Sequence, residues 1–271
     1  MTESEFDADT ATDTDAAVTG TATAVTTAAG HPAGIPARID YQRSRPHRAV
    51  PDVPNFRDAG VGAVRSGVLF RSGTLSLLTP QGAEALKALG VRVVVDLRTS
   101  TERSHWPDER HGLDYEDHHL PLLPDRAETG VEWPAGALSV YVFMAETGGY
   151  AIAGAVRRLA APDGLPAIVH CAVGKDRTGL TIAVLHHLAG LSEEEIVADF
   201  LRSNVHLGLD NGPVPYIDEN GDEQLSHPVE AENLLAALAR MREMHGSVDG
   251  YLLAHGVTED ELAALRALLS R

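Results

Sequence analysis

The stretch LPAIVHCAVGKDRTGLTIAVLHHLAG, residues 165–190, constrains the fold more than any other part of the sequence. Its first six residues are mostly apolar and include the β-branched pair Ile168-Val169, as expected of a buried strand, and residues 178–190 are predicted to form a mostly apolar helix. A short glycine-containing turn separates the two. A buried strand that leads directly into a helix is the repeating unit of an α/β sheet, so the sequence predicts a sheet covered by helices.

Strand signals recur along the chain. Apolar or alternating runs predict strands within residues 55–73, where an early hairpin is expected, and at 91–97, 115–123 and 165–170. Helical segments between several of these runs favour parallel pairing. We therefore expect an α/β fold with a small central, mostly parallel sheet flanked by helices.

Capping residues mark several helices. Thr79 is a typical N-cap, Pro80 suits the first helical position, and Gly90 ends the segment. Ser192–Glu195 and Thr258–Glu261 both match the capping box. Further helices are predicted at 150–161, 191–204, 229–245, 247–254 and 258–270.

Two segments carry no clear helix or strand signal. Residues 124–148 are expected to be irregular, and residues 206–228 to form a polar loop broken by Pro and Gly. In the helix predicted after that loop, the apolar stripe at helical spacing is expected to pack in the core.

The first 37 residues differ in composition from the rest. They are rich in Thr, Ala and Asp and poor in large apolar side chains, so residues 1–37 are expected to be a disordered acidic tail and 38–271 a single domain. No Lys or Arg precedes Arg38, and a secretory signal needs a basic segment before its apolar core. No apolar run approaches the roughly 18 residues of a membrane span. We expect a cytoplasmic protein without stable membrane insertion.

Charge and cysteine content exclude several classes. A formal net charge of −17 argues against nucleic-acid binding, which needs basic surfaces. A single cysteine rules out an internal disulfide framework, and no Cys/His spacing is typical of zinc sites. The adjacent pairs His118-His119 and His186-His187 match no ligand spacing either. We therefore expect no metal and no organic cofactor.

The single cysteine, Cys171, lies between the buried strand and the helix. A loop at that position directs several backbone N–H groups at one point, which binds anions, and Gly174 allows the tight turn. The same groups lower the pKa of a thiol. Arg177 has the planar fork that binds two phosphate oxygens, and Thr178 is placed to donate to the sulfur. Together these residues predict nucleophilic attack on phosphorus through a cysteinyl-phosphate intermediate.

The pattern His170-Cys171-x5-Arg177-Thr178 resembles the signature loop of the cysteine-dependent protein tyrosine phosphatases. With NFRDAG upstream and VVVDLR between, HCAVGKDRTG resembles the bacterial branch that acts on phosphotyrosine and lipids. The similarity runs from about residue 50 to the C-terminus. It implies that His170 orders the loop and that substrate contacts come from the loop, the start of the helix and one upstream aspartate: Ala172, Val173, Gly174, Lys175, Thr178, Gly179 and Asp96.

Lys175 and Asp176 lie inside the loop. In the resembled branch this pair is linked to activity on phosphoinositides, and an ammonium at this point suits a second phosphate. The alternative is that Lys175 only offsets the charge of Asp176. The resembled enzymes also carry a two-helix lid; here the segment after Ser203 is short, so a complete lid is not expected.

The reaction needs a proton donor for the leaving oxygen. Asp176 is preferred, because the resemblance implies an acid or orienting role at this position. Asp96 and Asp125 are alternatives, and Asp96 is equally suited to pairing with an arginine. Many tyrosine phosphatases carry the acid in a Trp-Pro-Asp loop, but Trp106-Pro107-Asp108 lies too far upstream of the cysteine, and Asp108 is taken as a chance match.

The sequence thus predicts a phosphatase in which Cys171 attacks, Arg177 holds the phosphoryl group and Asp176 handles a proton. The expected partner is a phosphorylated protein or phospholipid. The alternatives are a phosphate-binding module without turnover and, less well supported, thiol chemistry on arsenate or sulfur. Substrate and oligomeric state are left open.

Overall fold

The computed structural model describes residues 50–219 and 221–271. These residues all fall within one compact unit. The predicted boundary between tail and domain, at residues 37 and 38, lies outside the described residues and stays a prediction.

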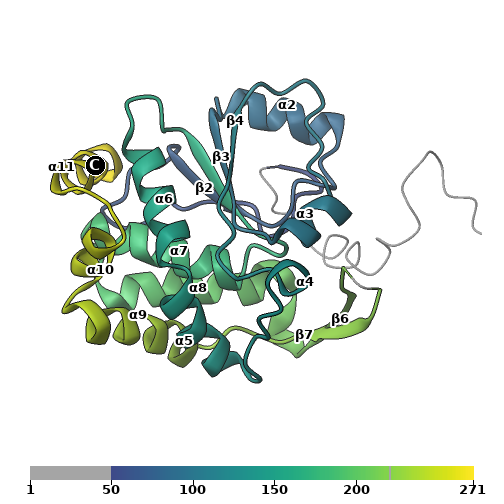
Figure 1. The fold of residues 1–271 in the computed structure, drawn as a ribbon. Helices are drawn as coiled ribbons and strands as arrows, with labels where there is room; N and C mark the ends of the chain where they lie inside the picture. Colours follow the sequence, from purple (N-terminus) through teal and green to yellow (C-terminus); the bar gives the residue numbers. More distant parts are fainter. Residues whose placement is uncertain (1–49, 220) are drawn as a thin grey trace, which may run out of the picture. The chain divides into compact units, whose positions relative to one another are not determined.

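A central sheet with the strand order β1-β2-β5-β3-β4 organises the described part of the chain (Figure 1). β1 pairs antiparallel with β2, and the remaining pairs are parallel. The strands are β1 (Arg57–Asp58), β2 (Leu69–Ser72), β3 (Val93–Asp96), β4 (Glu116–His119) and β5 (Ala167–His170). The predicted mostly parallel sheet and the early hairpin are confirmed.

Helices and one further hairpin surround this sheet. They are α2 (Pro80–Ala88), α3 (Ser100–His105), α4 (Arg126–Thr129), α5 (Ala137–Thr147), α6 (Gly149–Ala160), α7 (Asp176–Leu188), α8 (Glu193–Leu207), the 3₁₀ turn η1 (Leu209–Asn211), β6 (Val214–Ile217), β7 (Glu223–Ser226), α9 (Ala231–His245), α10 (Val248–Ala254) and α11 (Glu259–Leu269).

Side-chain alternation along the strands divides the core into two layers. Val94 of β3 and Ile168 of β5 pack on one face with the residues of α2. Their neighbours Val93, Val95 and Val169 pack on the other face with α6 and α7. Figure 1 shows α2 on one side of the sheet and the larger set of helices on the other. Because β5 is central and apolar on both faces, the loop that follows it begins from a fixed position.

Local capping explains where several helices begin. The Thr79 side chain accepts from the Gly82 N–H, as predicted, and Gly90 follows the helix with φ +67°. The capping boxes Ser192–Glu195 and Thr258–Glu261 are both formed. These bonds satisfy N–H groups that the helix itself leaves without partners.

Two expectations about loops are wrong. Residues 124–148 contain α4 and α5 instead of irregular chain, and residues 206–228 contain η1 and the β6–β7 hairpin instead of a polar loop. α5 begins at Gly136 without a side-chain cap, so it has no sequence signal at its start. It is stabilised by packing, chiefly against α9. That packing also places the apolar stripe of α9 in the core, as expected.

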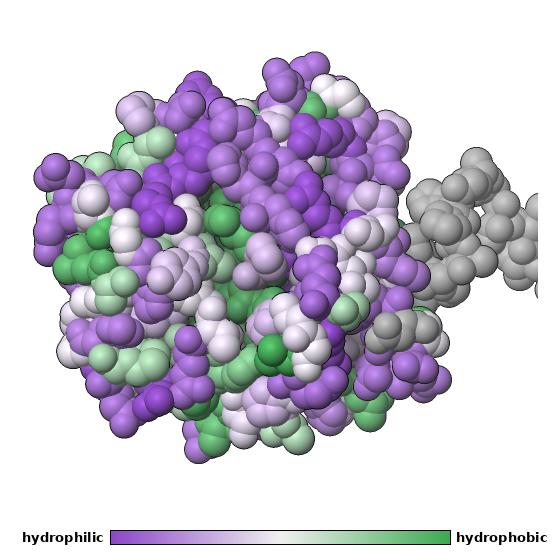
Figure 2. All heavy atoms as spheres, viewed as in Figure 1, coloured by the Kyte–Doolittle hydropathy of each residue, from purple (hydrophilic) through white to green (hydrophobic). Residues whose placement is uncertain are grey.

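Hydrophilic residues cover the part of the surface around α2 and α3, whereas hydrophobic residues are visible mainly in the middle and lower half of the same view (Figure 2). No helix in residues 50–219 and 221–271 combines the length and apolar character required to cross a bilayer.

A buried ion cluster joins the amino-terminal strands to α8. Asp199 Oδ2 accepts from Arg71 Nη1 at 2.8 Å, and Asp199 Oδ1 lies 3.4 Å from Arg57 Nε. All three side chains are almost fully buried. Burial alone raises the pKa of Asp199, but the two arginines outweigh it and lower the pKa to about 2. The folded state therefore depends on an ionised carboxylate at this position.

We expect this cluster to make folding stability pH-dependent on the acid side. Because the pKa is about 2 in the folded state and near 4 in an unfolded chain, Asp199 contributes about 2 kcal/mol that is present above pH 4 and lost as the pH falls through 2. Asp199→Asn should remove this contribution and leave two buried arginines without their carboxylate, lowering the free energy of unfolding at pH 7 by ~3–5 kcal/mol. Denaturant unfolding of both proteins at pH 7 and pH 3 measures this, and equal acid sensitivity would contradict it.

Candidate active site

The signature loop occupies residues 171–175, between the end of β5 and the start of α7. Gly174 has φ +74°, and a Cβ at this position would overlap the backbone of Ser72 on the neighbouring strand. Only glycine fits both conditions. The turn brings the Gly174 N–H to 3.3 Å from the Sγ of Cys171, so backbone donors converge on the sulfur as predicted.

The Cys171 thiol is buried, with 2% of the residue exposed. Burial raises its pKa, but Arg177, Thr178 and the amide of Val173 outweigh this effect and lower the pKa below the usual range. The Thr178 hydroxyl is buried without another hydrogen-bond partner, which leaves it to donate to the sulfur. The sequence therefore places its one cysteine where the thiolate is favoured.

Buried donors hold the loop from below. Asn55 Nδ2 and Arg71 Nη2 donate to the carbonyl oxygen of Gly174, at 2.7 and 3.1 Å. Arg71 also belongs to the Asp199 cluster, and Ser203 of α8 accepts from both Arg71 and Arg57. The NFRDAG motif, which is a weak signal in the sequence, is thus part of the support of the loop.

A second buried cluster lies around His170. The ring Nε2 is 3.3 Å from Asp108 Oδ2 and 3.8 Å from Asp96 Oδ1. Burial lowers the pKa of His170, but the two carboxylates outweigh this effect and raise it. Arg98 binds both acids, at 2.6 Å from Asp96 Oδ2 and 2.8 Å from Asp108 Oδ2. These acids and His170 have the spacing of metal ligands, but the guanidinium of Arg98 already binds both carboxylates.

Glu102 is a site residue that sequence reasoning missed. Its carboxylate accepts from both terminal nitrogens of Arg177, at 2.5 and 2.8 Å, and thereby fixes the plane of the guanidinium. Glu102 lies in α3, where it also forms a capping box with Thr99. The sequence T-S-T-E at 99–102 matches that box, so this signal identifies α3 and its glutamate.

A cavity of about 390 Å³ opens above the loop. Of the predicted residues, Ala172, Val173, Lys175, Asp176 and Arg177 line it. Cys171 is buried and is not among the lining residues, but it directly precedes Ala172. Its other walls come from α5, the segment before it, and the β6–β7 hairpin; they include Trp133, Val140, Tyr141, Met144, Tyr216, Asp218, Glu219, Leu225 and His227. The two segments expected to be loops therefore form the walls of the cavity.

Several predicted residues do not line this cavity. Gly179 packs against the ring of Phe200, where a Cβ would come within 2.7 Å. Asp96 is fully buried against Arg98, which matches the arginine pairing considered for it. Asp125 caps α4 and accepts from Thr101. None of these positions supports a substrate contact or, for Asp96 and Asp125, a proton donor.

Asp108 is also committed elsewhere, since it accepts from the Leu75 N–H as well as Arg98. This position agrees with the interpretation of Trp106-Pro107-Asp108 as a chance match. Trp106 is buried against Leu77.

Lys175 and Asp176 have defined partners. Lys175 Nζ donates to the carbonyl of His227 at 2.6 Å and to Ser226 Oγ at 3.2 Å, and it lies 3.6 Å from Asp176 Oδ2. The Tyr141 hydroxyl donates to Asp176 Oδ1 at 2.8 Å. The loop is thus joined to α5 through Asp176 and to the end of β7 through Lys175.

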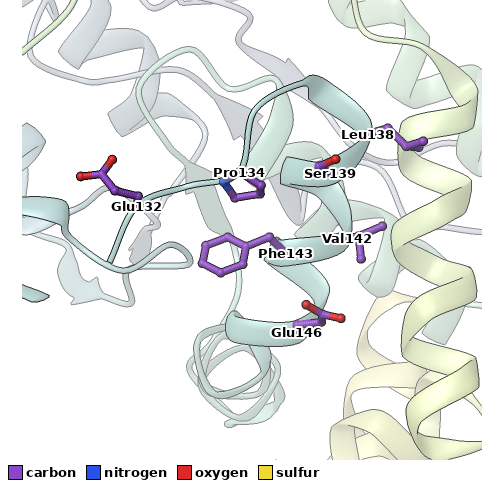
Figure 3. A pocket seen from close by; sticks show the side chains of 7 residues that line it. All are labelled: Glu132, Pro134, Leu138, Ser139, Val142, Phe143 and Glu146. Carbon is purple, nitrogen blue, oxygen red and sulfur yellow. The ribbon is translucent and has the colours of Figure 1, made fainter. Parts of the chain in front are cut away.

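A second cavity, of about 460 Å³, lies along another face of α5 (Figure 3). In Figure 3 the Pro134 and Phe143 rings lie side by side, and Glu132 and Glu146 lie at its edges. It is mainly apolar, and its lining contains no cysteine and no cationic side chain. Of these two cavities, only the first has the arrangement that can attack phosphorus.

A buried thiolate, a loop of backbone donors and an arginine fork, all following the central strand of a parallel sheet, define a cysteine-dependent phosphatase. Comparison with known proteins agrees: the model of a family described as the tyrosine phosphatase family matches residues 48–271. The chain belongs to this family.

Individual relatives are similar over most of the chain. The triple specificity protein phosphatase PtpB of Mycobacterium tuberculosis is 30% identical over 276 residues, covering 82% of this chain and 98% of its own. A tyrosine-protein phosphatase of Nostoc commune is 29% identical, covering 77% and 76%. Among solved structures, TpbA of P. aeruginosa is 20% identical over 70% of this chain and 87% of its own, with a TM-score of 0.35.

We predict that Gly174→Ala disrupts the loop. A displacement of about 1 Å at a reacting group costs ~100-fold in rate, so kcat/KM for an aryl phosphate should fall at least that far. Gly190→Ala is the matched control, because Gly190 has φ +84° at the end of α7 but open space around its Cβ position. It should cost about 1 kcal/mol of stability and leave kcat/KM unchanged. Equal kinetic losses in the two variants would contradict the role of Gly174.

Proposed function

We propose that this protein hydrolyses phosphotyrosine monoesters through a cysteinyl-phosphate intermediate. The observation that carries the proposal is the Cys171 thiol, whose pKa is lowered by Arg177 and by loop hydrogen bonds. The same arginine and the residues next to the cysteine, Ala172 and Val173, line the cavity. Membership of the tyrosine phosphatase family supports it.

In the first step the Cys171 thiolate attacks phosphorus, so that an S–P bond forms while the bond to the leaving oxygen breaks. The amides of the loop and the guanidinium of Arg177 bind the equatorial oxygens. Because Glu102 holds this guanidinium in place before substrate arrives, little reorganisation is needed in the transition state. Water then cleaves the S–P bond and releases phosphate.

Asp176 is proposed to handle a proton in this cycle. It lines the cavity next to Arg177, and Tyr141 holds one of its oxygens. A carboxylate fixed in this way is placed to accept the proton of the attacking water in the second step.

The cavity walls suit an aromatic phosphoester. Trp133, Val140, Met144 and Leu225 offer apolar surface above the charged floor, which fits the ring of phosphotyrosine. Lys175 also lines the cavity, so phosphoinositides are the second candidate substrate, together with phosphoserine and phosphothreonine. The name of PtpB as a triple specificity phosphatase supports testing all of them. We propose a phosphorylated protein or phospholipid as partner; a cytoplasmic location stays a prediction.

We expect phosphate release by the wild type in EDTA from a phosphotyrosine peptide, and none by Cys171→Ser. The serine variant should still bind the peptide, because the loop donors remain, whereas Arg177→Ala should lose both binding and turnover. A phosphoinositide measured in parallel shows whether Lys175 serves a second phosphate. Tight binding of phosphopeptide by the wild type without release would instead support a binding module.

We also expect Tyr141→Phe to lower kcat with little change in KM. The lost hydrogen bond to Asp176 is worth about 1 kcal/mol, or roughly fivefold in rate, and it orients a group that acts after substrate is bound. Tyr150→Phe is the matched control, since Tyr150 is 74% exposed and lies outside the cavity. Steady-state kinetics on a phosphotyrosine peptide give kcat and KM for both variants. A change confined to KM in Tyr141→Phe would argue against the role of Tyr141.

A further inference from the structure

Four carboxyl residues in the described part of the chain line the cavity above the loop: Glu102, Asp176, Asp218 and Glu219. A phosphatase of this kind needs one of its carboxyl groups protonated when the substrate binds, because the leaving oxygen takes up a proton as its bond to phosphorus breaks. The contacts of each group decide which of the four is suited to this role.

Three of the four have charged or hydrogen-bonding partners that suit an ionised carboxylate. Glu102 is bound by both terminal nitrogens of Arg177. Asp176 accepts from Tyr141 and lies 3.6 Å from the Lys175 ammonium. Asp218 accepts from the Asp222 N–H and from Gln224 Nε2 within its own hairpin.

Glu219 differs from these three. It lies in the turn of the β6–β7 hairpin, half-buried, and its carboxyl group forms no hydrogen bond or ion pair with the side chain of another described residue. Burial raises its pKa, and the neighbouring carboxylates Glu102 and Asp218 act in the same direction, while Arg177 opposes them. The remaining charged and titratable residues around the cavity are Arg126, Tyr141, Lys175, Asp176, Tyr216 and His227.

We infer that Glu219 is the proton donor to the leaving group, and this inference rests on the proposed function. In the first step the S–P bond forms, the bond between phosphorus and the leaving oxygen breaks, and the Glu219 O–H proton passes to that oxygen. In the second step a water oxygen attacks phosphorus, the S–P bond breaks to regenerate the thiolate, and the water proton passes to Asp176. Asp176 then releases this proton to solvent and Glu219 takes one up from solvent, which restores the starting state. Two carboxyl groups in different environments thus divide the two proton transfers.

The hairpin geometry is consistent with this role. Lys175 of the loop donates to Ser226 and to the carbonyl of His227 at the end of the hairpin, which ties the segment carrying Glu219 to the loop carrying Cys171. Glu219 lines the same cavity as Arg177 and the loop residues Ala172 and Val173, so it borders the space that a leaving group would occupy. An in-line displacement needs nucleophile and leaving group on opposite sides of phosphorus.

Leaving-group dependence tests the assignment. Phenyl phosphate has a poor leaving group that needs protonation, whereas p-nitrophenyl phosphate has a good one. We expect Glu219→Gln to lower kcat/KM by ~100-fold on phenyl phosphate and far less on p-nitrophenyl phosphate. The wild-type rate on phenyl phosphate should fall on the alkaline side, as Glu219 ionises, and this fall should be absent in the variant.

Glu223→Gln is the matched control, because Glu223 lies on the same hairpin, is exposed, and does not line the cavity. It should behave as the wild type on both substrates. Vanadate binding by every variant checks that the loop is intact.

Equal losses on both substrates, or no loss, in Glu219→Gln would overturn the assignment. So would a leaving-group-dependent loss in Asp176→Asn that Glu219→Gln does not show. Failure of the proposed function is distinguishable, because it appears as the absence of Cys171-dependent phosphate release in the wild type itself.

Discussion

The conformation of the signature loop depends on the hydrogen bonds that hold the carbonyl oxygen of Gly174. Asn55 and Arg71 donate to it from below, and because this oxygen is turned into the protein, the neighbouring amides face the sulfur and the cavity. Two buried arginines, Arg57 and Arg71, share the single carboxylate of Asp199, so the layer under the loop carries excess positive charge. In a chain with a formal net charge of −17, this is how positive potential is concentrated where a phosphate is bound.

The carboxyl groups near the loop have different roles because their surroundings differ. Asp96 and Asp108 are bound by Arg98 and stabilise the charged form of His170. Glu102 forms an ion pair with Arg177 and stabilises its positive charge. These acids act on the loop through a cationic partner, and of the three only Glu102 also lines the cavity. Proton transfer is left to carboxyl groups in the cavity, which is why the sequence alternatives Asp96, Asp108 and Asp125 receive no support from their positions.

Features that depend on residues close together in the chain could be predicted from the sequence, whereas features that depend on contacts between distant residues could not. Local sequence patterns indicate where the strands lie along the chain, the caps at Thr79, Ser192 and Thr258, and the cysteine loop. Glu102 lies 75 residues from the arginine it binds, and nothing near it indicates that partner. α5 has no capping side chain and depends on packing against α9, which follows it by nearly a hundred residues.

This difference in range bears on function. The loop that breaks the phosphoester is encoded in one continuous stretch, so the reaction class can be read from the sequence. The cavity walls come from α5 and the β6–β7 hairpin, whose positions are set by distant contacts, such as Lys175 with His227 and Tyr141 with Asp176. Substrate choice depends on those walls. Two chains with the same loop can therefore share a mechanism and differ in substrate, and residues such as Glu219 become recognisable only once the hairpin is placed above the thiol.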